Sequence, residues 1–398
     1  MTFSIRRLPS LTARWHSTLL HSLLSSQRRC YSKTISYDSK LHLPTDPQEW
    51  TKVFKGSTRI NHRISLRNPT TAAAIADAFV PEGSRDKVII EAYPGPGQLT
   101  RALLDLPKER IKKIILLENW ESYIDWLKPL KEADPRVEIV EMDPFLWDTY
   151  SHVSELGMLD GVQKMEWNKG VHPQLQFISH LPSTVHSEQL LSQFLRYMPD
   201  GNWLFAYGRV PLSLILSEHL YREPQRVVAA VTGTARCKLS IVAEATASCT
   251  PTLDFAATQP YDQHFYPLPS LRRMAIDMKK DVRAIGRPYR TMTVVPLEDQ
   301  LIGKGQMDAW DFCLRRLFVK KSTQLKEVIN LLAPNARVLI TAVTNPNLPE
   351  SEQLDVSKRI KDMDARDWSI LLKAFYEWPF RPLDLTIHDN YASSLRSL

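Results

Sequence analysis

The residue types needed to hold a nucleoside occur at four places in the chain: Glu91, the turn with Gly95 and Gly97, Glu118 and Asp143. The stretch 87–100 reads Lys-Val-Ile-Ile-Glu-Ala-Tyr-Pro-Gly-Pro-Gly-Gln-Leu-Thr, which predicts a strand, a turn at Gly95 and Gly97, and a helix. Glycines let the backbone approach a ligand closely, and a helix N-terminus offers free N–H groups to an anion. The Gly-x-Gly-x-x-Gly dinucleotide fingerprint is absent, so a nicotinamide-dependent enzyme is a poor fit.

Further polar groups follow the next predicted strands. The strand 113–118 ends in Glu118, about 20 residues past the glycines, which is the separation expected of a carboxylate that binds a ribose hydroxyl. The strand 137–141 is followed by Asp143, and the strand 175–178 leads into His180. Because open α/β sheets bind ligands at the carboxyl ends of their strands, these side chains are expected to meet at one edge.

The order of these motifs resembles the ribosomal RNA adenine N6-dimethyltransferase family, whose members have a class I S-adenosylmethionine-dependent methyltransferase fold. Three other stretches add to the resemblance: 236–245 is similar to the family's sixth strand, 265–269 to its Phe-x-Pro-x-Pro segment, and Leu66 to the last residue of its Gln-x-Phe-Leu motif. Residues 316–321 and 378–380 resemble the fungal mitochondrial branch, the transcription factor B proteins that work with mitochondrial RNA polymerase.

The resemblance implies an S-adenosylmethionine site. Its candidate residues are Leu66, Glu91, Tyr93, Gly95, Gly97, Glu118 and Asp143. Tyr93 stands where the family has glycine, and we expect its phenol to crowd the methionine end of the cofactor. Glu118 and Asp143 keep the acceptors for ribose and adenine, so the expected binding is weak or vestigial.

The motif that holds the target adenine is altered. The family uses Asn-(Leu/Ile)-Pro-(Tyr/Phe), in which the Asn side chain and the Pro carbonyl hold the amino group and the aromatic ring stacks on the flipped base. The matching residues are His180, Leu181, Pro182 and Ser183. Serine cannot stack, and stacking contributes about 1–3 kcal/mol per base. We therefore expect methyl transfer to be lost.

The formal net charge of +7 is concentrated in one place. Residues 1–31 contain five arginines and no acid, which leaves about +2 for the rest of the chain. The most basic local segment, 265–290, has seven basic and two acidic residues interleaved with Phe265 and Tyr289, a composition that suits phosphate contact and base stacking. Candidate nucleic-acid contacts are Arg272, Arg273, Lys279, Lys280, Arg283 and Arg287; a solvated helix face is the alternative.

The N-terminal composition predicts targeting to the mitochondrial matrix. Residues 1–31 are rich in Arg and Ser, lack acids, and can form one apolar helical face, which is typical of a presequence cleaved after Tyr31; a disordered basic tail is the alternative. The four cysteines have no metal-ligand spacing and are expected to be free thiols. No apolar run reaches about 18 residues, so no membrane span is expected.

We expect two structured domains after the presequence: a methyltransferase-like α/β domain at 32–298 and a C-terminal helical domain with its tail at 299–398. Late strands are expected at 203–207, 227–231, 238–245 and 291–295, and helices at 213–221, 306–319, 322–332 and 365–378. Residues 146–173 are long for a crossover and are expected to be an insertion.

Three functional hypotheses follow. The first is a mitochondrial transcription initiation factor, expected from the family to be a monomer, that assists the polymerase in promoter recognition and melting. The second is an active adenine N6-dimethyltransferase of the mitochondrial small ribosomal subunit, with stacking supplied by Phe145 or Trp147. The third is a ribosome assembly factor that binds ribosomal RNA without modifying it.

Overall fold

The computed structural model describes residues 40–54, 63–222, 236–269 and 285–385. The expected presequence and the expected strand at 227–231 lie outside these ranges. Among the helices described, none is both long and apolar enough to cross a lipid bilayer.

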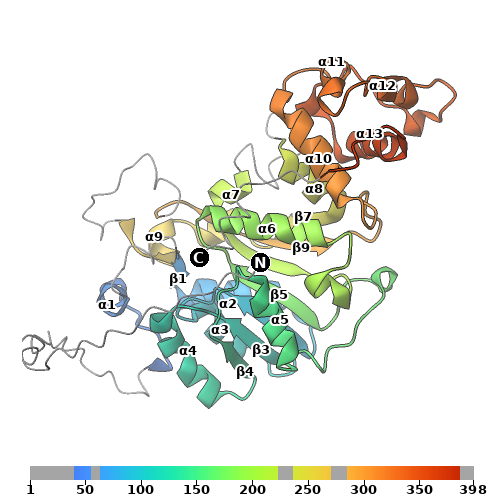
Figure 1. Cartoon of the computed structure of the whole chain (residues 1–398). Helices are drawn as coiled ribbons and strands as arrows, with labels where there is room; N and C mark the ends of the chain where they lie inside the picture. The colour runs from blue at the N-terminus through green and yellow to red at the C-terminus, as the bar shows by residue number, and fades with distance from the viewer. Residues whose placement is uncertain (1–39, 55–62, 223–235, 270–284, 386–398) are drawn as a thin grey trace, which may run out of the picture.

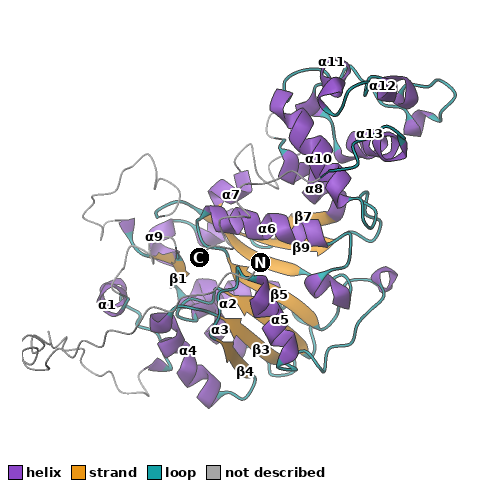
Figure 2. Ribbon diagram, in the orientation of Figure 1, coloured by secondary structure: helices purple, strands orange, loops and turns teal. Residues whose placement is uncertain are grey.

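A seven-stranded sheet forms the centre of the larger part of the molecule (Figures 1 and 2), in the order β4-β3-β2-β5-β6-β9-β7. The neighbouring strands β4, β3, β2, β5 and β6 pair in parallel, and β9 runs antiparallel between β6 and β7. The bounds are β2 Lys87–Ala92, β3 Ile111–Leu117, β4 Val137–Val140, β5 Leu175–His180, β6 Leu212–Ser217, β7 Ala247–Pro251 and β9 Tyr289–Pro296. The predicted α/β class is confirmed.

Helices cover both faces of the sheet because the strand side chains that point to either face are apolar. Ile89 packs with α2 (Pro69–Phe79), α3 (Gln98–Asp105) and α4 (Glu121–Ala133). Ile90 faces the other way, toward α5 (Trp147–Glu155) and α6 (Val185–Tyr197). Such continuous apolar runs are typical of parallel strands buried on both faces.

An N-terminal arm, described at 40–54 and 63–68, contacts the carboxyl end of the sheet. It contains α1 (Pro47–Val53) and β1 (Ser65–Leu66), and β1 pairs antiparallel with β8 (Phe265–Tyr266), which follows the short helix α9 (Tyr261–His264). Trp50 and Phe54 of the arm are buried against Tyr123 and Tyr266.

Several late elements differ from the predictions. Residues 203–207 form a 3-10 helix rather than a strand, with Trp203 at a φ of +58° that no strand adopts. The predicted helix at 213–221 is strand β6 followed by α7 (Glu218–Arg222). Short apolar runs cannot be assigned by periodicity alone, and here pairing with β5 and β9 decides.

The predicted strand at 238–245, including the segment that resembles the family's sixth strand, is a helix, α8 (Lys238–Thr246); the strand β7 follows it. Ser240 caps this helix by accepting a hydrogen bond from the Cys237 N–H. The inward face of α8 carries Ile241 and Ala245, four residues apart, and both are fully buried. In a strand, Ala243 would point to the same face as these two side chains, whereas here it packs in the other core cluster, as expected of a helix.

Beyond β9 the structure is helical, and the predicted helices at 306–319 and 365–378 are confirmed as α10 (Met307–Leu317) and α13 (Ala365–Glu377). The segment 322–332 forms only α11 (Leu325–Val328) and a 3-10 turn, and α12 (Val338–Val343) was not predicted. These helices gather at the β7 end of the sheet, with α8 between them and the sheet (Figure 1). The core of this helical part includes Ile241 and Ala245 of α8.

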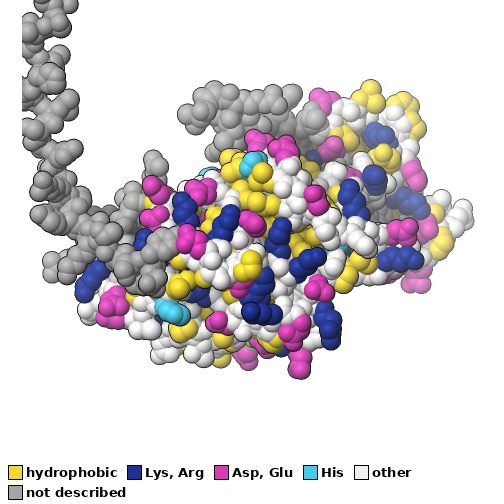
Figure 3. Space-filling view, turned by 90° about the horizontal axis from the view of Figure 1, so that it is seen from below, with side chains coloured by type: hydrophobic (Ala, Val, Ile, Leu, Met, Phe, Trp, Pro, Cys, Tyr) yellow, Lys and Arg dark blue, Asp and Glu magenta, His cyan; other side chains and the backbone are white. Residues whose placement is uncertain are grey.

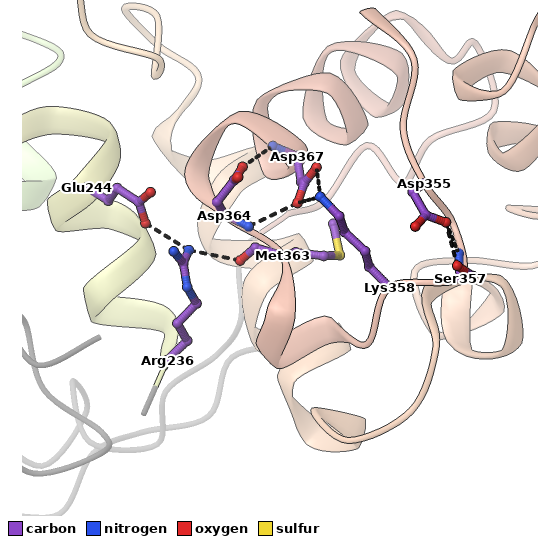
Figure 4. A network of polar contacts seen from close by, with 8 residues as sticks. All are labelled: Arg236, Glu244, Asp355, Ser357, Lys358, Met363, Asp364 and Asp367. Atoms are coloured by element: carbon purple, nitrogen blue, oxygen red, sulfur yellow. Dashed lines mark hydrogen bonds and ion pairs between the residues drawn. The ribbon is translucent and has the colours of Figure 1, made fainter. Parts of the chain in front are cut away.

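A polar network fastens α8 to the helical part (Figure 4). The Arg236 guanidinium donates to the Glu244 carboxylate at 2.8 Å and to the Met363 carbonyl at 3.0 Å, just before α13 begins. Asp364 and Asp367 form a reciprocal cap at the start of α13, and Lys358 donates to both Asp367 oxygens. The start of α13 is therefore fixed by hydrogen bonds on two sides.

Replacing Arg236 with alanine should destabilise the protein by about 1–2 kcal/mol, because the Met363 carbonyl loses its donor in a partly buried place. Lys373→Ala, which removes an exposed ion pair of 3.5 Å with Glu352, is the control and should cost less than about 0.5 kcal/mol. Urea unfolding of both variants measures the difference; equal losses would contradict the proposed role of Arg236.

Candidate functional site

The predicted acids meet at the carboxyl edge of the parallel strands. Glu91 lies near the end of β2 and accepts a hydrogen bond from Thr100 Oγ1 of α3 at 2.9 Å. Burial raises the pKa of Glu91 to about 7. The strand and the helix on either side of the glycine turn are therefore joined by this buried carboxyl group.

The two glycines of the turn have the left-handed backbone that their residue type permits. Gly95 has a φ of +61° and donates its N–H to Glu118 Oε2 at 3.2 Å. Gly97 has a φ of +86° and precedes the first turn of α3. A Cβ atom on Gly97 would lie 2.6 Å from Leu127 Cδ2, so α4 packs directly against the turn.

Glu118 follows β3 and is fully buried. Arg63 donates to both of its oxygens, from Nη1 at 3.1 Å and Nη2 at 2.5 Å. The backbone N–H groups of Gly95, Asn119 and Trp120 donate to the same carboxylate. Five donors therefore surround the carboxylate that was expected to bind a ribose hydroxyl.

Arg63 was not among the residues predicted from the sequence to form this site. Burial opposes its charge, but the neighbouring Glu118 more than compensates, and the pKa of Arg63 is raised above its ordinary value. If Leu66 ends the Gln-x-Phe-Leu pattern, Arg63 stands in the place of the glutamine, and this spacing was the available signal. Leu66 itself is buried in the core with Ile75 and Phe265.

Tyr93 lies between Arg63 and Asp143. The Arg63 guanidinium carbon is 4.7 Å from the centroid of the Tyr93 ring, and the Tyr93 hydroxyl donates to Asp143 Oδ1 at 3.3 Å. Tyr93 has a φ of +59°, a conformation that favours glycine, and it is 8% exposed. The ring and hydroxyl group of Tyr93 therefore fill the space between Glu118 and Asp143.

The four residues of the altered motif end β5 and lead into α6. His180 packs edge-on against Tyr289 and Phe265, with ring centroids 5.3 and 6.0 Å away. Its Nε2 atom is buried and has no hydrogen-bond partner among the residues that the structure describes. Burial, with a smaller contribution from Arg63, lowers the pKa of His180 to about 3, so the ring is neutral at physiological pH.

The other motif atoms already have partners in the protein. The Pro182 carbonyl accepts from Ser187 Oγ at 2.5 Å and from the Thr184 N–H at 2.9 Å, which fixes the start of α6. Ser183 Oγ lies 2.6 Å from the Tyr289 hydroxyl. Leu181 is buried in the core.

Comparison with known proteins places this geometry in a family. The family model of ribosomal RNA adenine dimethylases matches residues 62–363. The chain belongs to this family.

Relatives of the chain include mitochondrial proteins of yeasts. "Mitochondrial transcription factor 1" of Lachancea kluyveri is 22% identical over 74% of this chain and 82% of its own length. The protein of the same name from Saccharomyces cerevisiae is 22% identical over 80% of this chain and 89% of its own. Among solved structures, 23S rRNA methyltransferase ErmE aligns with a TM-score of 0.46 and 13% identity over 78% of this chain and 98% of its own.

The family implies S-adenosylmethionine, and the residues at the carboxyl edge do not fit it. A carboxylate offers about four lone-pair sites, and five donors of the protein already point at Glu118. The Tyr93 side chain occupies the approach to Asp143 where the family has only a glycine hydrogen atom. A nucleoside could reach these acids only after Arg63 and Tyr93 had moved.

Phe145 and Trp147 are the rings predicted to replace the missing stacking residue if the chain is an active methyltransferase. Phe145 stacks on the exposed His186 ring at 4.9 Å and is partly buried. Trp147 packs edge-on against Tyr197 and Trp203. Phe145 is therefore the better placed of the two to meet a base.

The expected nucleic-acid segment is placed only in part. Arg272, Arg273, Lys279, Lys280 and Arg283 lie outside the described residues, and Arg287 is half-buried. Arg290 pairs with Glu218 and lies over the Phe255 ring. On the face shown in Figure 3, Lys and Arg are interspersed with Asp and Glu.

The proposal that Phe265 and Tyr289 stack on bases was wrong. Both side chains are 0% exposed and pack against each other in the core, with ring centroids 4.9 Å apart. The sequence shows aromatic residues among basic ones, but it does not show that β8 and β9 turn these rings inward.

Gly97→Ala should destabilise the protein by about 2–4 kcal/mol, since a left-handed backbone costs about 1 kcal/mol and overpacking against Leu127 adds about 1–3. Gly83→Ala is a matched control, because Gly83 has the same φ of +86° and a Cβ there would meet no atom of the described part of the chain within 4 Å. The Gly83→Ala variant should lose only the stability that the left-handed backbone costs, about 1 kcal/mol. Chemical denaturation of both variants provides the comparison, and similar losses would show that Leu127 moves aside freely.

Stability should fall on acidification in a way that depends on His180. Its folded pKa of about 3 lies below the ordinary value of 6.5, so the unfolded chain binds the proton more readily. The contribution of His180 to the free energy of unfolding is fully present above pH 6.5. It falls by about 1.4 kcal/mol per pH unit below this value, and the fall ends only near the folded pKa.

The measurement is the free energy of unfolding of wild type and His180→Asn between pH 7.5 and 5.5. Wild type should lose about 1.4 kcal/mol more than the variant over this range. Glu91 acts in the opposite direction, because its raised folded pKa gives stability at low pH that is lost as pH rises through about 7, but it is common to both proteins. Parallel curves for the two proteins would refute the assignment.

Proposed function

We propose that the chain is a mitochondrial transcription initiation factor that assists the mitochondrial RNA polymerase in promoter recognition and melting, without transferring methyl groups. Support comes from the yeast relatives named mitochondrial transcription factor 1, which match most of this chain and most of their own length. The proposed location is the mitochondrial matrix, after removal of residues 1–31. The proposed partners are the polymerase and promoter DNA, with ribosomal RNA as the alternative nucleic acid, and the protein acts as a monomer.

The proposed loss of methyl transfer rests on the hydrogen bonds that Pro182 and Ser183 already make within the protein. A target amino group needs a free carbonyl acceptor, and the Pro182 carbonyl already receives hydrogen bonds from Ser187 and Thr184. Ser183 offers no ring for stacking and is bonded to Tyr289. An adenine at this place would lack both the Pro182 carbonyl as an amino-group acceptor and the aromatic platform that orients it.

The methyl donor meets the same difficulty. The five donors around Glu118 and the side chain of Tyr93 support weak or vestigial binding of S-adenosylmethionine. The nucleic-acid role does not need the cofactor, because holding an unpaired base requires stacking and phosphate contact only. The half-buried Arg287 and the Phe145–His186 pair are the proposed contacts among the described residues.

The test is promoter opening by the mitochondrial RNA polymerase with the full chain, followed by 2-aminopurine fluorescence in the DNA. Wild type should stimulate opening of a duplex promoter, and Phe145→Ala should reduce the effect about tenfold, because stacking contributes about 1–3 kcal/mol per base. Leu146→Ala is the control, since this neighbouring side chain is 48% exposed and has no ring. Absence of stimulation on both duplex and pre-melted promoters would refute the proposed function.

The same preparation tests the loss of methyl transfer. Radiolabelled S-adenosylmethionine and a ribosomal RNA hairpin should give no incorporation above background. Incorporation that requires Asp143 would establish the methyltransferase instead.

A further inference from the structure

The Arg63 side chain reaches the carboxylate that the family uses for a bound nucleoside. We propose that Arg63 is an internal ligand of the former cofactor pocket: it takes the place of the ribose hydroxyls on Glu118 and, together with Tyr93, keeps S-adenosylmethionine out. This inference does not depend on a role in transcription.

The first support is the geometry of the pair. The guanidinium group makes two parallel hydrogen bonds to the two Glu118 oxygens, the arrangement that matches an arginine fork to a carboxylate. The side chain of Arg63 is 12% exposed and that of Glu118 is 0% exposed. Tyr93 and Tyr123 lie against the guanidinium, with ring centroids 4.7 and 5.6 Å from its carbon atom.

The second support is that the N-terminal arm, which carries Arg63, is tied to the glycine turn at another point. Arg101 of α3 donates to the Lys40 and Leu41 carbonyls of the arm and also to the Pro96 and Gly97 carbonyls of the turn. It bonds only carbonyl groups in these contacts, and burial lowers the pKa of Arg101 to about 10. The described residues of the arm are therefore held near the glycine turn both at Lys40 and Leu41 and at Arg63.

The third support is the close contact of β1 with the same turn. A Cβ atom on Gly95 would lie 3.2 Å from Ser65 Oγ, so the arm leaves no spare volume beside this glycine. Ser65 Oγ also lies 3.5 Å from the Tyr123 hydroxyl. The residues that would surround a nucleoside thus contact the arm instead.

The consequence for binding is a large loss of affinity. A nucleoside must displace Arg63 from Glu118, and separating a buried ion pair lowers affinity by about a thousandfold. In exchange, the chain gains a preformed carboxyl edge: the ordering that a cofactor would supply on binding comes from the protein itself.

The test compares full-length wild type with Arg63→Gln/Tyr93→Gly in thermal unfolding and calorimetry with S-adenosylmethionine. Millimolar S-adenosylmethionine should leave the Tm of wild type unchanged and raise that of the double variant by about 2 °C or more. Arg67→Gln is the matched control, because Arg67 is on the same arm but bonds the Asp262 and Gln263 carbonyls away from the pocket. It should behave as wild type does.

Micromolar binding by wild type would overturn the proposal, and so would a folded double variant that shows no response to S-adenosylmethionine. Neither readout involves a promoter or the polymerase, so failure here is separate from failure of the proposed transcription role.

Amide hydrogen exchange of wild type decides the matter if the double variant does not fold. The N–H groups of Gly95, Asn119 and Trp120 all donate to Glu118. They should exchange slowly without any ligand, and S-adenosylmethionine should not slow them further. Fast exchange without ligand, or slowing on its addition, would overturn the proposal.

Discussion

The ion pair between Arg63 and Glu118 is the interaction on which the carboxyl edge of the sheet depends. Removing two charges from water is costly, and a buried pair is stable only when further hydrogen bonds satisfy the remaining polar atoms. Here three backbone N–H groups complete the carboxylate, and two tyrosine rings lie against the guanidinium. The pair therefore joins the glycine turn, the end of β3, the start of α4 and the N-terminal arm in one arrangement.

The altered motif illustrates how catalytic positions can take structural roles. In the family pattern, Pro182 and Ser183 would stand where a base is held, yet their polar atoms bond Ser187, Thr184 and Tyr289. His180 fills its space by edge-on packing with aromatic rings. Each change replaces a contact to a ligand with a contact inside the protein, and each makes the end of β5 less available for chemistry.

The parallel part of the fold was accessible from the sequence because its signals are local. The apolar runs in β2 and β3 and the helix after the glycine turn lie within short windows, and pattern reading placed them correctly. The later elements were misassigned where tertiary contacts decide. β6 is a strand because β5 and β9 pair with it, and α8 is a helix whose buried stripe serves the helical part of the molecule.

The residues of the candidate site, too, could be predicted from the sequence only where the signals are local. Residue type and spacing predicted that Glu91, Gly95, Glu118 and Asp143 lie together at the carboxyl edge, as they do, and marked Tyr93 as a departure; that they bind a nucleoside stays a prediction. Arg63 was missed since its contact to Glu118 spans 55 residues, and the direction of Phe265 and Tyr289 depends on strands that pair across the chain. Sequence spacing identifies residues that line a site, but it does not show whether another part of the chain already fills it.

The retention of the fold and the loss of its chemistry are compatible for a physical reason. Two core clusters lie on the two faces of the sheet and a third lies in the helical part, whereas the altered residues lie where strands end. Substitutions at strand ends change what the edge can bind, and the buried Tyr93 and His180 side chains are accommodated by packing against their neighbours. A cofactor normally stabilises the state to which it binds, and its loss leaves buried acids without partners. Arg63 supplies the missing partner from within the chain, so the carboxyl edge can remain ordered after the ligand is no longer needed.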